Sequence, residues 1–122
     1  MRRLLVLATA LLAAGCAGPS VVSASGAGGP DALDCALAEA TARGYAVVDA
    51  EDGVFFRARQ PMRYWLGQRG DNEFDVLTAS RARGQLTVLA GGEESAADGT
   101  QAIAPSEAAV DEARAVVAAC TG

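Results

Sequence analysis

The chain contains no lysine and no histidine among its 122 residues. Without histidine, the serine–histidine and cysteine–histidine mechanisms of nucleophilic catalysis are excluded. Without lysine, Schiff-base catalysis and a lysine-containing phosphate loop are excluded as well. Basic charge is also scarce, because 10 arginines stand against 15 carboxylates and the formal net charge is −5. A nucleic-acid-binding protein needs a basic face, so the net charge argues against this class and predicts no nucleic-acid partner.

The amino-terminal residues have the pattern of a secretory signal. Arg2 and Arg3 precede an apolar run over residues 4–14. As a helix this run would be about 16 Å long, which is roughly half of a bilayer core and too short to span it. Small residues and Pro19 follow, without an amphipathic face. We therefore predict a signal peptide over residues 1–15 rather than a buried helix.

The end of this signal, Leu12-Ala13-Ala14-Gly15-Cys16, resembles the lipobox of bacterial lipoproteins. The family most often has leucine three residues before the cysteine, where this chain has Ala13. The resemblance covers residues 1–16 only. It implies cleavage before Cys16, a diacylglyceryl group on its thiol and acylation of the new amino group. Two or more acyl chains anchor a protein stably in a membrane. Plain secretion with a free Cys16 is the alternative.

The residue after the lipidated cysteine helps to sort lipoproteins in Gram-negative bacteria. Aspartate there favours the inner membrane, and this chain has Ala17. For a Gram-negative source, the resemblance therefore implies an outer-membrane protein that faces the periplasm. Removing residues 1–15 removes Arg2 and Arg3, so the mature charge is 8 − 15 = −7.

The rest of the chain is expected to form a flexible tether and one small domain. Residues 16–29 are predicted to be the lipidated cysteine and tether, because glycine, serine and alanine dominate them. Within the domain, residues 30–122, the patterns predict helices over 31–43 and 105–120 and strands over 45–50, 54–60, 74–80 and 85–90. Hairpin turns are expected at 51–53 and 81–84, and a polar, glycine-containing loop before the second helix, with Ser106 as the N-cap of that helix. Pro61 is expected to end the second strand. The order α-β-β-β-β-α predicts a two-layer α+β sandwich, with both helices on one face of a four-stranded antiparallel sheet.

The positions of the two remaining cysteines bear on how the two predicted helices are arranged. Cys35 lies near the start of the first predicted helix, and Cys120 lies at the end of the second. The two helices should be antiparallel, so these ends should meet. We therefore predict a Cys35–Cys120 disulfide, which fits an oxidising compartment. Cys35 points away from the face of Leu33 and Leu37, so either the bond lies on the flank or the helix begins later. Two free buried thiols are the alternative.

Two acidic segments have side chains that could bind a metal ion or act in catalysis. Residues 71–75 place oxygen-bearing side chains at alternate positions, as a calcium loop does. Val76 and Ala82, however, stand where such a loop needs glycine and an acidic residue. A solvated loop that enters a strand fits better. The carboxylates within residues 49–52 surround a tight turn, and local hydrogen bonding explains them better than catalysis does. We predict no catalytic residue, cofactor or metal site.

The segment Met62-Arg63-Tyr64-Trp65-Leu66 connects the two predicted hairpins and contains the only tryptophan. Its aromatic residues could cover one end of the core. They could also form a contact surface, because tryptophan, tyrosine and arginine are enriched at the energetic centres of interfaces.

Strand alternation predicts which residues face the helices. Phe56, Val76 and Val88 are expected beneath them, and Val48, Phe55, Leu77 and Leu89 on the uncovered face. A bulge or a different register is the alternative. The candidate partner surface is Phe55, Tyr64, Trp65, Leu77 and Leu89.

These patterns favour a non-enzymatic, membrane-anchored envelope lipoprotein. Its small domain is expected to bind a protein partner or to support envelope assembly. The layout of tether and small domain is broadly similar to that of accessory lipoproteins of outer-membrane assembly machines, although no motif in residues 30–122 identifies such a family. A small-ligand or metal-binding lipoprotein that uses the acidic loops is the alternative.

Overall fold

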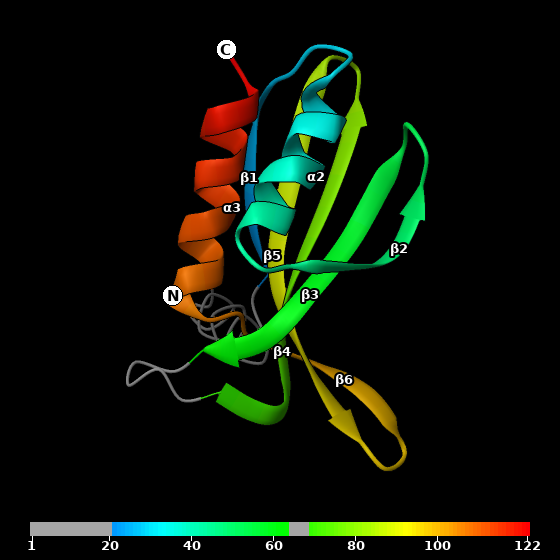
Figure 1. The fold of residues 1–122 in the computed structure, drawn as a ribbon, viewed down its shortest axis with the longest axis vertical. Coiled ribbons are helices and arrows are strands. Elements are labelled where there is room, and N and C mark those ends of the chain that lie inside the picture. The colour runs from blue at the N-terminus through cyan, green and yellow to red at the C-terminus, as the bar shows by residue number, and fades with distance from the viewer. Residues whose placement is uncertain (1–20, 64–68) are drawn as a thin grey trace, which may run out of the picture.

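The computed structural model describes residues 21–63 and 69–122 (Figure 1). The elements in chain order are β1 (Val22–Ala27), α2 (Ala32–Ala42), β2 (Ala46–Glu51), β3 (Phe55–Arg63), β4 (Arg69–Ala82), β5 (Gln85–Ala96), β6 (Gly99–Ile103) and α3 (Glu107–Cys120). The fold class is α+β. Within the described ranges, no helix is long and apolar enough to cross a membrane.

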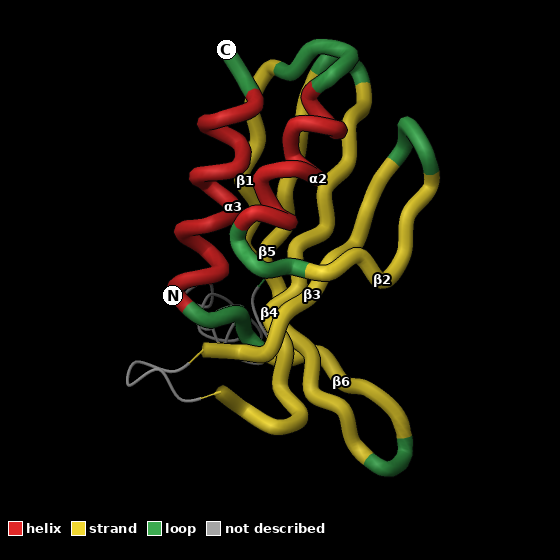
Figure 2. The backbone as a smooth tube through the Cα atoms, in the orientation of Figure 1, coloured by secondary structure: helices red, strands yellow, loops and turns green. Residues whose placement is uncertain are grey.

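All of these strands belong to one antiparallel sheet. Its main path runs β1–β5–β4–β3–β2, and β6 pairs with the second half of β5. Because β4 occupies one edge of β5, β1 and β6 share the other edge, beside residues 85–90 and 92–96 respectively. Helices α2 and α3 lie side by side on one face of the sheet (Figures 1 and 2). The hairpin of β5 and β6 extends beyond them.

The predicted four-stranded sheet in the order α-β-β-β-β-α is wrong, because the described residues form six strands. The four predicted strands are present as β2 to β5. The additional strands are β1, which lies within the predicted tether, and β6, which lies in a predicted polar loop. The sheet therefore includes residues 22–27, which precede residue 30.

Strand β1 is held by its neighbours rather than by its own propensity. Serine, alanine and glycine are weak strand formers, but β1 pairs with six residues of β5 and packs beside α3. A Cβ on Gly26 would lie 3.0 Å from Oγ1 of Thr121, and one on Gly28 would lie 2.7 Å from Cβ of Ala32. The small residues that predict a linker are therefore the ones that allow this close packing.

Both predicted hairpin turns are confirmed. The β4–β5 turn contains Arg83 at φ 54° and Gly84 at φ 73°. Two successive residues with positive φ fit the type I′ turn, whose twist matches that of the flanking strands. The prediction that Pro61 ends its strand is wrong. Pro61 pairs with Phe74, the register shifts just after it, and β3 continues to Arg63. Proline removes one N–H from the ladder, which interrupts the pairing without ending the strand.

Small helix residues meet larger sheet residues in the core. Ala36 and Ala40 of α2, and Ala109 and Ala113 of α3, are almost completely buried. Alanine lets both helices approach the sheet closely. The space between the layers is filled mainly from the sheet and the middle of α3, by Phe56, Leu77, Leu86, Val88 and Val116.

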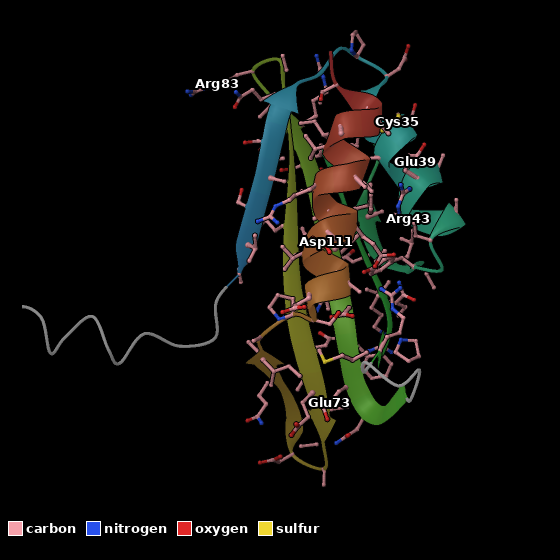
Figure 3. The ribbon with its side chains drawn as sticks, turned by 90° about the vertical axis from the view of Figure 1, so that its left-hand side faces the viewer. Cys35, Glu39, Arg43, Glu73, Arg83 and Asp111 are labelled. Atoms are coloured by element: carbon pink, nitrogen blue, oxygen red, sulfur yellow. A yellow bond between two sulfur atoms is a disulfide. The ribbon has the colours of Figure 1, made fainter. Side chains whose placement is uncertain are left out.

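Cys35 and Cys120 form the predicted disulfide, with a Cα–Cα distance of 5.6 Å. The bond joins the first turn of α2 to the last turn of α3, and Cys35 is labelled in Figure 3. Cys35 is half-buried, whereas Leu33 and Ala36 on the same helix are buried. The bond thus lies on the flank of α2 that faces α3. Closing a loop across 85 residues contributes up to about 4–5 kcal/mol in the chain-entropy model.

Candidate protein-interaction face

The helices leave one face of the sheet open. Cross-strand partners share a face, so the register groups Arg57 with Thr78 and Leu89, and Arg59 with Val76. We refer to the following residues of β3, β4 and β5 as the uncovered face: Phe55, Arg57, Arg59, Phe74, Val76, Thr78, Thr87, Leu89 and Glu93.

Phe55 and Leu89 lie on the uncovered face, as predicted. Leu89 is 37% exposed and Phe55 is half-buried. Val48, predicted for the same face, lies where the β2–β3 register shifts and is exposed. Tyr64 and Trp65 lie outside the described residues. That the candidate residues form a partner surface stays a prediction.

The predicted faces of Val76 and Leu77 are wrong. Leu77 pairs with Ala90 and is fully buried beneath the helices, so it cannot belong to a partner surface. Val76 pairs with Arg59 on the uncovered face. Side chains alternate along a strand, so an error of one residue in phase exchanges the two. The phase of β4 is fixed by Asp75, whose carboxylate points towards α3 and accepts hydrogen bonds there.

A carboxylate between two arginines organises the uncovered face. Arg57 and Arg59 are two residues apart on β3, so both point to this side of the sheet. Both form ion pairs with Glu93 of β5, and Nη1 of Arg59 lies 3.0 Å from Oε1 of Glu93. The guanidinium of Arg59 also lies over the ring of Phe74, 4.4 Å from its centroid, which is a cation–π contact. Two long side chains are thereby held in defined positions.

Opposite charges on Glu93 and on Arg57 and Arg59 stabilise this cluster. Burial of Glu93 alone would raise its pKa, but hydrogen bonds and attraction from Arg59 and Arg57 outweigh this effect, and the pKa of Glu93 is lowered. Glu93 is therefore ionised at neutral pH. Both arginine side chains remain 38% exposed. Since a guanidinium has five N–H donors, both can still donate to a partner.

A second polar cluster lies on the opposite, helix-covered side. The hydroxyl of Tyr45 donates to Oε1 of Glu112 at 3.0 Å, and Arg63 forms an ion pair with the same carboxylate. Burial and the negative charge of Glu112 raise the pKa of Tyr45. The hydrogen bond to Glu112 raises the pKa of Arg63. This cluster ties the end of β3 to α3 through the hydroxyl of Tyr45 and the two Nη atoms of Arg63, whereas the buried Nε of Arg63 has no hydrogen-bond partner among the described residues.

The described residues of the two acidic segments lie in different settings. Asp75, in the strand that the predicted solvated loop was expected to enter, belongs to β4 and is fully buried rather than solvated. Asp49, Glu51 and Asp52 are exposed around the β2–β3 turn. In the part of the chain that the structure describes, no group of three or more histidine, cysteine or acidic residues could hold a metal ion.

Sequence reasoning missed the cluster of Arg57, Arg59 and Glu93. One signal was present, because arginines alternate with alanine within a predicted strand and must share a face. Their partner Glu93 fell in a predicted loop, since β5 was expected to end at Ala90 and it continues to Ala96.

Comparisons with protein-family models, with curated protein sequences and with solved structures found no match for this chain.

Proposed function

We propose that this protein is a bacterial envelope lipoprotein, anchored by acyl chains on Cys16, whose small non-catalytic domain binds a protein partner. The observation that carries the proposal is the Cys35–Cys120 disulfide. Structural disulfides occur mainly in exported proteins, and lipidation at a lipobox also requires export. The disulfide and the lipobox thus support the same compartment independently. In a Gram-negative cell we expect the outer membrane, facing the periplasm, because Ala17 replaces the aspartate that favours inner-membrane retention.

The position of β1 leaves only a short segment between the proposed lipid anchor and the sheet. Only six residue steps separate Cys16 from Val22, the first residue of β1. Even a fully extended chain would span at most about 21 Å over this distance. The end of the sheet at which β1 begins would therefore stay close to the lipid surface, and a partner would be met next to the membrane.

Composition and order support the uncovered face as the partner-binding surface. It combines the exposed Leu89 and the half-buried Phe55 with two arginines whose positions are fixed by Glu93. Aromatic residues and arginine are enriched in interfaces, and preordered side chains lose less entropy on binding. The described groups with shifted pKa, Tyr45, Arg63 and Glu93, are all engaged in internal pairs, which supports binding rather than catalysis.

Fractionation of cells tests the anchor. The Cys16→Ser variant should move from the membrane fraction to the soluble fraction, because it cannot be lipidated. The matched control is Ala17→Ser, which alters the neighbouring position and should stay in the membrane fraction. A Cys16→Ser protein that remained membrane-bound would contradict the proposal.

Site-specific photocrosslinking tests the face. A photoreactive phenylalanine analogue at Leu89 should crosslink one defined protein in intact cells. The same analogue at Ala38, an exposed position on α2, is the control and should not produce this product. An identical pattern at both positions, or no product at either, would contradict the uncovered face as the partner surface.

A further inference from the structure

One edge of strand β1 has no strand partner among the described residues. Strand β1 is the first strand in the path of the sheet, and in the described residues only β5 pairs with it. Its six residues pair with β5 in an uninterrupted register. In Figure 3, β1 stands at one margin of the sheet, with α3 beside it rather than over it. The edge is therefore open to solvent along the described strand.

Hydrogen bonding identifies the main-chain groups at this edge. The nitrogen of Gly28 donates to the oxygen of Gly84 at 2.9 Å, so Gly28 faces β5. In an antiparallel ladder the residues alternate in direction, so Ser23, Ser25 and Ala27 face outwards. The oxygen of Ala27 indeed accepts a hydrogen bond from the nitrogen of Gly122 rather than from β5. The outward N–H and C=O groups of Ser23 and Ser25 are left to bind an added strand.

The two edge strands of the main sheet, β1 and β2, differ in how well they are protected against pairing with an added strand. The opposite edge strand, β2, has a register shift and carries exposed carboxylates at Asp49 and Glu51. Irregular pairing and charge are the usual features that prevent strand addition at an edge. Strand β1 has neither, since its sequence is Val-Ser-Ala-Ser-Gly-Ala and its register is regular.

A groove adjoins the first residues of β1. It has a volume of about 410 Å³ and lies between Val22 and the first turns of α3, with apolar walls from Val22, Pro105 and Val110. Glu107, Asp111 and Arg114 also line it, and Asp111 is labelled in Figure 3. A residue paired opposite Val22 would share the helix-covered face of the sheet. Its side chain would therefore point towards this groove.

We propose that the β1 edge and this groove together bind an extended segment of a different protein by strand addition. The main chain of the segment would pair with Ser23 and Ser25, and one apolar side chain would fill the groove. Such binding combines main-chain hydrogen bonds with a side-chain pocket that gives specificity. This surface is separate from the uncovered face and extends the proposed function by a second kind of contact.

Charge and side-chain size identify the occupant. Arg114 lies 3.8 Å from Asp111, and among the described residues Glu107 forms no ion pair, so the rim of the groove is acidic. The whole chain also carries a net charge of −5. A segment with arginine or lysine next to its apolar residue is complementary to this rim. A second copy of β1 fits less well, because its serine, alanine and glycine side chains would leave the groove largely empty.

Selection from a random peptide library displayed on phage tests the proposal, with the detergent-solubilised full-length protein as the target. Enriched peptides should alternate apolar and polar residues and carry arginine or lysine beside one apolar residue. Synthetic copies should bind the Ser25→Pro variant at least about tenfold more weakly, because proline removes an outward N–H. They should bind the matched control Ser25→Ala as well as the wild type. Glu107→Lys should weaken binding of the basic peptides.

Hydrogen exchange gives a second measurement that does not depend on the folding of a variant. The amides of Ser23 and Ser25 should exchange more slowly when peptide is bound, whereas the amide of Thr100 on β6 should not change. The proposal is overturned if no peptide is enriched, if the peptides bind Ser25→Pro as well as Ser25→Ala, or if exchange at Ser23 and Ser25 is unaffected. A dimer in which β1 pairs with its own copy would also overturn it. None of these readouts depends on lipidation of Cys16.

Discussion

The carboxylate of Asp75 in β4 accepts two hydrogen bonds from Ser106, the residue that caps α3. The nitrogen of Ser106 lies 2.9 Å from Oδ1, and its hydroxyl oxygen lies 2.6 Å from Oδ2. The same hydroxyl accepts from the nitrogen of Ala109 at 3.2 Å. Asp75 is fully buried, and a buried carboxylate requires such partners. One short chain of hydrogen bonds therefore fixes where α3 begins relative to the sheet.

Replacing Asp75 should destabilise the domain more than replacing an exposed aspartate. Asp75→Ala removes both acceptors and leaves the half-buried donors of Ser106 without their partner, which should cost about 1–3 kcal/mol of unfolding free energy. Urea denaturation measures the change. Asp98→Ala in the exposed β5–β6 turn is the control and should alter stability by less than about 0.5 kcal/mol. Equal effects of the two changes would contradict the role of Asp75.

Two neighbouring glycines test whether β1 belongs to the fold. A Cβ on Gly28 would lie 2.7 Å from Cβ of Ala32, whereas a Cβ on Gly29 would meet nothing within 4 Å. Gly28→Ala should therefore lower the unfolding free energy by about 1–3 kcal/mol, and Gly29→Ala should be nearly neutral. Thermal or urea unfolding distinguishes them. A flexible tether over this segment would make both changes neutral.

Acid titration tests the cluster on the uncovered face. The pKa of Glu93 is lowered in the folded protein, so its ionised form contributes stability above the pKa of an unfolded glutamate, about 4.3. This contribution is lost as the pH falls through the lower, folded-state pKa. Glu93→Gln should thus be less stable than the wild type at pH 7, and the difference should shrink below about pH 4. A difference that is constant with pH would contradict the pairing.

Alkaline titration tests the cluster on the helix-covered side. The pKa of Tyr45 is raised in the folded protein, so its neutral form contributes stability that is present below the pKa of an unfolded tyrosine, about 10. Above that pH the unfolded chain loses the proton first, and stability falls. The wild type should therefore lose stability more steeply above about pH 10 than Tyr45→Phe does. Parallel pH profiles would contradict the shift.

Most of the architecture follows from patterns in the sequence. Hydrophobic alternation indicated β2 to β5, the glycines at 53 and 84 marked the hairpin turns, and Ser106 marked the start of α3. The positions of Cys35 and Cys120 at opposite ends of two antiparallel helices predicted the disulfide. These features are local or depend on simple connectivity, so one sequence is sufficient to find them.

The missed features depend on contacts between distant residues. Strand β1 has the composition of a linker and becomes a strand because β5 and α3 lie beside it. The faces of Val76 and Leu77 were exchanged because an aspartate such as Asp75 is expected to face solvent until its partner Ser106, 31 residues later, is known. For the candidate surface, alternation was sufficient for Phe55 and Leu89. It could not reveal Glu93 as the partner of Arg57 and Arg59.

Mass spectrometry of the wild-type protein, extracted from membranes, tests the proposed lipid anchor. We expect a mature chain that begins at Cys16, carries a diacylglyceryl group and an additional amino-terminal acyl chain, and retains the Cys35–Cys120 disulfide. A chain that begins at another residue, or an unmodified Cys16, would contradict the proposed anchoring.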